Sequence, residues 1–534
     1  MLSFAMLPGM ARAAGTGAIT VDGTVATRYD AYRLFSATVV DDADTDQKIA
    51  TDVTWANDAV CQAVLPVLHD VGLDSSASTA QEAAEWMNGD GHMTTALATK
   101  LARAICRSGV PSVALNAGTV AELPSGYWLI VADDDAIAQG EAGTAPIMAL
   151  VGGSAVTVKP KAATPKVAKH VLEDSTTAWQ KAADATVADD LYWRLSATVP
   201  AGLTAYDTYT VRFVDTMGAG LDPSKVAASM RVYVAAGADG GFDAVPTGKD
   251  GRAGTEPAKG WTDITAQCGV SVDGKTFIVC TGDLIAALGG TDTFTAGARV
   301  VAVYNAPLNG ACNHGIAKGN PNEVYLRYPR SPFADQSGDA GFTRTPSDDA
   351  CAYTWDLALT KRGSDGDKPL AGAVLSITDD RGRTLAADGS WDAEGKATVT
   401  TGEDGRVTVS GVDSGKLEVR ELKAPKGYTA FEGTRSVTVK AEGLDVDQVA
   451  AAKPKLTITA ESPLRADSAD GSTGSLEASL INTPTGTPPS ITTGGFMPST
   501  GDMAMYAAAA AAVAGAALIV VALLVKRGGG SHKE

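Results

Sequence analysis

Three polar residues in the C-terminal third of the chain stand where apolar residues are expected. Side chains of equal parity share one face of a β-strand. Lys361, Glu421 and Asn482 each have the parity of the apolar residues that precede them in an alternating stretch. Those apolar residues are Leu357, Leu359, Leu417, Val419, Leu476, Ala478 and Leu480. Burying an amine, a carboxyl or a carboxamide alone is unfavourable, so we expect the three polar groups to lie together in one core.

The three residue types match one reaction. A lysine in an apolar site has a lowered pKa and can act as a neutral nucleophile. A glutamic acid in the same site has a raised pKa, so it can stay protonated and polarise the asparagine carbonyl. Attack of the Lys361 amine on the Asn482 side chain would release ammonia and leave an isopeptide bond, with Glu421 as catalyst. The alternative is that each side chain extends along a sheet edge to reach solvent.

Composition limits the classes of protein that this chain can belong to. Its 534 residues predict three or four domains, and 45% hydrophobic residues are enough to form their cores. The 44 Lys and Arg against 62 Asp and Glu give a net charge of −18, which argues against a nucleic-acid partner because phosphate binding needs a basic surface. Many glycines and few aromatic residues favour short strands joined by turns.

The elements that must position the polar residues are predicted to be strands of tandem β-sandwiches. Residues 16–155 predict a sandwich with a helical insertion. Residues 156–335 and 352–483 contain short alternating strands separated by Gly and Asp turns, which is typical of immunoglobulin-like sandwiches. Residues 484–502 are rich in Pro, Thr and Gly and predict an extended linker. The expected fold class is therefore all-β.

Both ends of the chain indicate export. Residues 503–525 are 23 uncharged residues, which would form a helix of about 35 Å, long enough to cross a bilayer. Lys526 and Arg527 follow, in a tail of residues 526–534, and positive charge stays on the cytoplasmic side. A buried core helix is the alternative. Residues 1–15, with an A-x-A motif, are interpreted as the remnant of a signal peptide or else as a disordered segment.

An extracellular location favours disulfides between the six cysteines. Two pairs follow from the expected elements: one joins helical stretches at residues 57–71 and 92–106, and one flanks a hairpin at Asp273-Gly274. The last pair would connect two domains. The predicted pairs are Cys61–Cys106, Cys268–Cys280 and Cys312–Cys351. Free buried thiols are the alternative.

Residues 352–483 resemble the Cna protein B-type (prealbumin-like) domain found in Gram-positive pilins. The resemblance rests on Leu370-Ala371-Gly372-Ala373, on residues 400–405 (TTGEDG) and on residues 421–428 (ELKAPKGY), which are similar to the family's "E-box". In that family the E-box glutamate promotes a bond between a first-strand lysine and a last-strand asparagine. The resemblance assigns these roles to Glu421, Lys361 and Asn482.

The preceding part of the chain resembles backbone pilins as well. Residues 206–221 and 303–328 are similar to the fimbrial isopeptide-forming domain, and residues 29–35 and 123–127 to N-terminal pilin domains. Within the middle domain, Lys169 and Asp215 have the parity of apolar neighbours, so they are candidates for a second bond with Asp215 as promoter. The family's asparagine position holds Arg330 here. Either another asparagine, such as Asn305, takes its place or no bond forms.

Two sites for an outside enzyme follow from the same resemblance. The pentapeptide Met497-Pro498-Ser499-Thr500-Gly501, followed by an apolar helix and a basic tail, resembles a sortase sorting signal. Cleavage would fall between Thr500 and Gly501, and Met497 departs from the leucine that the family prefers. Polymerisation also needs an acceptor amine. Lys161 aligns with the acceptor lysine between the first two domains, and Lys159 is a rival.

The sequence thus predicts a cell-wall-anchored pilus shaft subunit that supports adhesion and is not an enzyme, apart from forming its own internal bonds. The implied partners are pilin-specific and housekeeping sortases, identical subunits, peptidoglycan and host surface ligands. No cofactor and no metal site are predicted. The expected location is the Gram-positive cell wall, with a membrane-inserted stage before sortase cleavage. The alternatives are a monomeric wall-anchored adhesin and a surface hydrolase.

Overall fold

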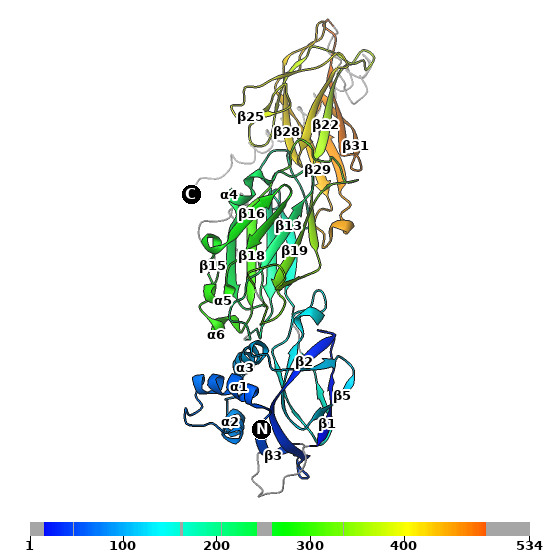
Figure 1. The fold of residues 1–534 in the computed structure, drawn as a ribbon. Helices are drawn as coiled ribbons and strands as arrows, with labels where there is room; N and C mark the ends of the chain where they lie inside the picture. Colours follow the sequence, from blue (N-terminus) through cyan, green and yellow to red (C-terminus); the bar gives the residue numbers. More distant parts are fainter. Residues whose placement is uncertain are drawn as a thin grey trace, which may run out of the picture.

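Three β-sandwich domains follow one another along an elongated molecule (Figure 1). The computed structural model describes residues 15–486, except residues 46, 161–163, 204, 243–258 and 335. The predicted all-β class is confirmed. The predicted membrane helix at 503–525 lies outside the described residues, and within the described part of the chain no helix is long and apolar enough to cross a membrane.

The first domain has two sheets that pack on one core. One sheet has the order β3-β2-β6-β7, with β4 paired to β2, and the other has the order β5-β1-β8. Their strands are β1 (Thr16–Val21), β2 (Arg28–Asp41), β3 (Lys48–Trp55), β4 (Val113–Asn116), β5 (Val120–Pro124), β6 (Gly126–Ala132), β7 (Ile147–Val151) and β8 (Val156–Val158). Because β8 pairs with β1 in parallel, the first domain extends three residues beyond the predicted boundary at residue 155.

Helices cover the other face of the larger sheet in this domain. They are α1 (Asp58–Asp70), α2 (Ala80–Asn88) and α3 (Thr95–Arg107). The helical insertion was predicted at 57–71 and 92–106, so α1 and α3 are confirmed. Helix α2 was missed, although Thr79 and Glu82 form a capping box at its start, which is a recognisable helix-start signal. The apolar sides of the three helices pack on Phe35, Leu129 and Leu150 of the sheet.

The middle domain is a larger sandwich with the orders β10-β9-β12-β18-β14-β15 and β11-β21-β19-β13-β17-β16, and β20 pairs with β19. Its strands are β9 (Lys166–Glu173), β10 (Ala178–Gln180), β11 (Ala182–Asp184), β12 (Tyr192–Val199), β13 (Arg212–Met217), β14 (Arg231–Ala236), β15 (Thr262–Asp263), β16 (Gly269–Asp273), β17 (Thr276–Cys280), β18 (Ala298–Asn305), β19 (Asn320–Pro329), β20 (Phe342–Arg344) and β21 (Asp348–Tyr353). Short helices α4 (Val226–Ser229), α5 (Leu284–Ala287) and α6 (Thr291–Phe294) lie at its ends. Both sheets contribute to one continuous core.

The third domain begins where the middle one ends. Its sheets have the orders β27-β22-β32-β31 and β25-β24-β23-β28-β29-β30, with β26 paired to β23. The strands are β22 (Trp355–Gly363), β23 (Val374–Thr378), β24 (Thr384–Leu385), β25 (Trp391–Asp392), β26 (Val399–Thr400), β27 (Arg406–Val412), β28 (Gly415–Lys423), β29 (Thr434–Glu442), β30 (Lys455–Ala460), β31 (Leu464–Asp470) and β32 (Ser475–Asn482). The first strand, β22, and the last strand, β32, are parallel neighbours.

Buried polar contacts join the domains at both junctions. Between the first and the middle domain, the Tyr328 hydroxyl donates to the Gly140 carbonyl at 2.7 Å. Between the middle and the third domain, Asp184 accepts from Trp355 Nε1 at 2.6 Å and from the Ser414 backbone N–H at 2.9 Å. Burial of Asp413 raises the pKa of its carboxyl, and the neighbouring Asp184 raises it further. Each junction is thus a specific contact and not a bare linker.

Candidate functional site

The structure brings together the three polar residues predicted in the third domain. Lys361 on β22 and Asn482 on β32 lie on neighbouring strands of one sheet, and Glu421 on β28 reaches them from the facing sheet. The Lys361 Nζ donates to Asn482 Oδ1. It also lies 3.2 Å from Glu421 Oε1. The Asn482 Nδ2 donates to both Glu421 oxygens, at 3.0 and 3.1 Å.

This group is closed off from solvent. The side chains of Lys361 and Glu421 are both 0% exposed, and Asn482 is buried. Burial lowers the pKa of Lys361 to about 8, although the nearby Glu421 carboxyl opposes the shift. About a tenth of the amine is therefore neutral at pH 7, far more than for an ordinary lysine, and the neutral amine is the form that can attack a carbonyl.

Glu421 contacts both reacting side chains and is itself held in place. Its Oε2 accepts the Phe431 backbone N–H at 3.1 Å, so the loop after the E-box fixes the carboxyl group. From this position Glu421 can take a proton from the Lys361 amine and deliver one to the Asn482 nitrogen. The Nζ–Cγ bond would form, the Cγ–Nδ2 bond would break, and one ammonia would leave.

A second buried lysine cluster lies in the middle domain. Lys169 on β9 and Asp215 on β13 come from opposite sheets, and both side chains are fully buried and in direct contact. Burial lowers the pKa of Lys169 to about 8, against the effect of Asp215, and raises the pKa of Asp215, against the effect of Lys169. The predicted Lys169–Asp215 pair is thus placed together by the fold.

The asparagine in this cluster is Asn322, which was not among the predicted residues. Asn322 on β19 is fully buried, and its Nδ2 donates to the Tyr304 hydroxyl at 2.8 Å. Lys169 Nζ donates to the same hydroxyl at 2.9 Å, and that hydroxyl donates to Asp215 Oδ2 at 3.0 Å. The Tyr304 hydroxyl therefore links all three groups. Asn322 has the parity of Val324 and Leu326, so the alternation that located Lys361 could have located it.

The two positions considered for that asparagine lie elsewhere. Asn305 accepts the Leu191 backbone N–H at 3.1 Å and donates to Asp190 Oδ1 at 2.6 Å. Arg330 donates to the Asp134 carbonyl at 3.1 Å, at the junction with the first domain. Neither residue takes part in the Lys169 cluster.

All six cysteines are free thiols in the structure. Cys268 directly precedes Gly269, which pairs with Cys280 across the β16–β17 hairpin, so these two are the best placed for a bridge. Cys312 belongs to the core of the middle domain, and Cys351, on β21 of the same domain, packs with the core of the third domain. The three disulfides, including Cys61–Cys106, stay predictions.

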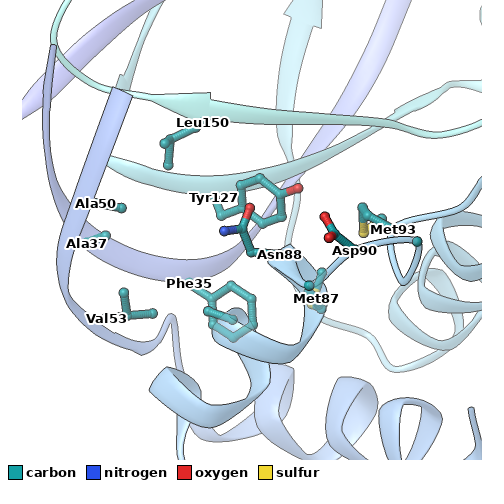
Figure 2. A pocket seen from close by; sticks show the side chains of 13 residues that line it. Phe35, Ala37, Ala50, Val53, Met87, Asn88, Asp90, Met93, Tyr127 and Leu150 are labelled. Atoms are coloured by element: carbon teal, nitrogen blue, oxygen red, sulfur yellow. The ribbon is translucent and has the colours of Figure 1, made fainter. Parts of the chain in front are cut away.

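An apolar pocket of about 270 Å³ lies in the first domain between the larger sheet and the segment that follows α2 (Figure 2). Phe35, Val53, Met87 and Leu150 line it, and Asp90 is its one acidic side chain. The polar side chains of the pocket are those of Asn88, Asp90 and Tyr127.

The sites predicted for an outside enzyme fall mostly outside the described residues. The sorting pentapeptide at 497–501 and Lys161 both lie there. The rival acceptor Lys159 is described: its side chain is 73% exposed and stands 3.6 Å from Asp22. Its amine is thus accessible directly after β8.

A family model matches part of the third domain. Residues 356–453 match the family model described as the SpaA prealbumin-like fold domain. This stretch is similar to that domain family. The match confirms the predicted prealbumin-like fold of the third domain, and it covers Lys361 and Glu421, while Asn482 lies beyond its end.

Two further comparisons give similarity to streptococcal and corynebacterial surface proteins. The trypsin-resistant surface T6 protein of Streptococcus pyogenes serotype M6 is 30% identical over 143 residues, which is 25% of this chain and 24% of that protein. The matched stretch thus spans about a quarter of the T6 protein. The solved T6 backbone pilin has a TM-score of 0.48 at 16% identity and covers 89% of this chain and 100% of its own. The Corynebacterium diphtheriae major pilin SpaD has a TM-score of 0.42 at 15% identity, with coverages of 88% and 98%.

Proposed function

We propose that this chain is the shaft-forming subunit of a pilus on a Gram-positive cell surface. The observation that carries the proposal is the buried Lys361–Glu421–Asn482 group in the domain that contains the match to the SpaA model. Such a group has no evident role in ligand binding because it is closed to solvent. It is suited to make the domain resistant to pulling, which is what a shaft subunit needs.

The first internal bond joins Lys361 to Asn482 with Glu421 as promoter. These residues are 121 positions apart, and by analogy with a disulfide, closing a loop of this size stabilises by roughly 4–5 kcal/mol. Force that enters at the beginning of β22 and leaves at the end of β32 then passes through the covalent bond, so the interior of the domain carries little load.

The second internal bond joins Lys169 to Asn322 with Asp215 as promoter. Support comes from the shared Tyr304 hydroxyl and from two buried acceptors, Asp215 Oδ1 and Asn322 Oδ1, which lack a hydrogen-bond partner among the described residues. Unpaired buried acceptors are unfavourable. Such unpaired acceptors are expected at a reactive site, where the polar groups are positioned for bond formation and not for the most stable hydrogen bonding.

Polymerisation uses the sorting motif and an amine of the next subunit. A sortase would cleave between Thr500 and Gly501 and transfer Thr500 to Lys161, or to Lys159, which is exposed. The partners are then pilin-specific and housekeeping sortases, identical subunits and, at the base, peptidoglycan. Host surface ligands would be bound by the finished pilus. The chain itself acts as substrate and structural element, not as an enzyme on other molecules.

Acceptor variants expressed in the native host test this function. Wild-type chain should give a high-mass ladder on SDS gels, and Lys161→Ala should abolish it, while Lys159→Ala serves as the matched control. If Lys159→Ala alone removes the ladder, the acceptor is Lys159. A wild-type chain that reaches the wall without any ladder would contradict the shaft role and favour the monomeric adhesin.

A further inference from the structure

A row of arginines crosses three neighbouring strands of the middle domain. Arg212 of β13 is the direct partner of Arg327 on β19, and Arg327 is the direct partner of Arg344 on β20. The neighbours of Arg212 and Arg327 along their strands, Phe213 and Leu326, point into the core, so the arginines share the outer face. Like charges directly opposite each other on antiparallel strands are destabilising, and this row therefore needs a negative counter-charge.

The protein supplies that counter-charge only in part. Asp339 accepts from Arg212 at 2.8 Å and from Arg327 at 2.9 Å. Arg344 lies over the Tyr325 ring, 5.0 Å from its centre, and forms no ion pair with another residue in the described part of the chain. One carboxylate thus faces three guanidinium groups.

A pocket opens beside this row, at the junction with the first domain. Its volume is about 370 Å³. The lining includes Gln139, Arg327, Arg330, Asp339, Thr343 and Arg344. Three arginines and one aspartate give the lining a formal charge of +2, and the carboxyl of Asp134 also interacts with Arg330, on a chain whose net charge is −18. The negative charge of the whole protein disfavours general binding of polyanions. The positively charged pocket, in contrast, favours an anion that binds within it.

The arginines are held in position before any ligand arrives. Arg212 stacks on the Phe342 ring at 4.0 Å, and its side chain is 17% exposed. Arg330 donates one bond to the Asp134 carbonyl at 3.1 Å, which fixes its direction across the junction. Preorganised guanidinium groups bind carboxylate or sulfate oxygens through paired hydrogen bonds and lose little entropy in doing so.

We propose that this pocket binds a sugar that carries an oxyanion, either the carboxylate of a sugar acid or a sulfate ester. The arginines would take the anionic group. The pocket is larger than a bare anion needs and falls in the range of small-ligand sites, and Gln139 and Thr343 offer polar groups for sugar hydroxyls. Asp339 is 71% exposed, and its carboxylate occupies two of the arginines, so it competes with the incoming anion.

Calorimetric titration of the full-length chain at low salt tests the proposal. The probes are N-acetylneuraminic acid, N-acetylglucosamine 6-sulfate and, as the neutral control, N-acetylglucosamine. We expect at least one anionic sugar to bind and the neutral sugar not to bind. Whichever anionic probe binds more tightly identifies the carboxylate or the sulfate as the preferred group.

Two variants with opposite expected effects make the test independent of folding defects. Arg344→Gln should weaken binding by about tenfold, the size of one charged contact, and Asp339→Asn should strengthen it several-fold by freeing Arg212 and Arg327. Arg231→Gln, an exposed arginine of the same domain outside the pocket, should change nothing. Equal binding of charged and neutral sugars, unchanged binding in Arg344→Gln, or no gain in Asp339→Asn would each overturn the proposal.

Discussion

The third and middle domains contain the same kinds of polar residue in two different arrangements. In the third domain, lysine and asparagine lie on parallel neighbours of one sheet, and the acid comes from the facing sheet. In the middle domain, Lys169 stands on one sheet, while Asp215 and Asn322 lie on adjacent strands of the other. A bond in the third domain would tie its first strand to its last, whereas a bond in the middle domain would tie the two sheets through the core.

The acid also reaches its partners differently. Glu421 contacts lysine and asparagine directly. Asp215 contacts Lys169, but the Tyr304 hydroxyl connects it to Asn322. The shorter aspartate side chain needs this third group to complete the network. On the function proposed above, a closed, buried group of an amine, an acid and an amide is what the chemistry needs, and two different sheet geometries supply it here.

Removing Glu421 should have the largest effect. Glu421→Ala leaves Lys361 buried without its acid and without a route to the bond, and breaking such a pair destabilises by about 3–5 kcal/mol in addition to the lost crosslink. We expect a lower unfolding temperature for the third domain alone, measured by calorimetry. Glu418→Ala, an exposed glutamate on the same strand, is the control. An unchanged unfolding transition of the third domain in Glu421→Ala would contradict the claim that Glu421 acts through direct contact with Lys361 and Asn482.

Asp215→Ala should act in the same direction on the middle domain and leave the third domain unchanged. The expected loss is similar, about 3–5 kcal/mol, because Lys169 would keep its burial without its ion-pair partner. Limited proteolysis followed by mass mapping separates the domains. Glu323→Ala, exposed on β19, is the control. If Asp215→Ala weakened both domains equally, the two clusters would not be independent.

Tyr304→Phe tests the feature that the third domain lacks. It removes the hydroxyl that joins Lys169, Asp215 and Asn322, and we expect a loss of about 1–3 kcal/mol together with slower bonding in the middle domain only. Tyr206→Phe is the matched control, because the Tyr206 hydroxyl is buried without a partner among the described residues. Bonding in Tyr304→Phe at the wild-type rate would show that the hydroxyl has no positioning role.

The pH dependence should be shared by the two clusters, since burial lowers the pKa of both lysines to about 8. The neutral amine is the nucleophile, so bonding in newly synthesised chain should speed up by about tenfold per pH unit below that value and level off above it. Gel-shift assays between pH 6 and pH 9 measure this. A rate that does not change with pH would contradict attack by a neutral amine at either site.

Alternation along single strands was enough to predict Lys361, Glu421 and Asn482, because each follows a run of apolar residues on the same face of its strand. Asn322 was not predicted because it precedes the apolar residues that share its strand face, Val324 and Leu326, whereas the three other residues follow such a run. The Tyr304 bridge depends on which strands face each other across the sandwich, and a single strand's pattern does not contain that information. The row of Arg212, Arg327 and Arg344 could not be predicted for the same reason, because only the register of three paired strands brings these residues side by side.

The most direct test of the central claim is the intact mass of the reduced, purified chain, followed by mapping of crosslinked peptides. Each bond removes one ammonia, about 17 Da. We predict a deficit of two ammonias, with one crosslinked peptide containing Lys361 and Asn482 and another containing Lys169 and Asn322. A mass equal to that of the unmodified chain, with Lys361 recovered in an ordinary linear peptide, would contradict the account.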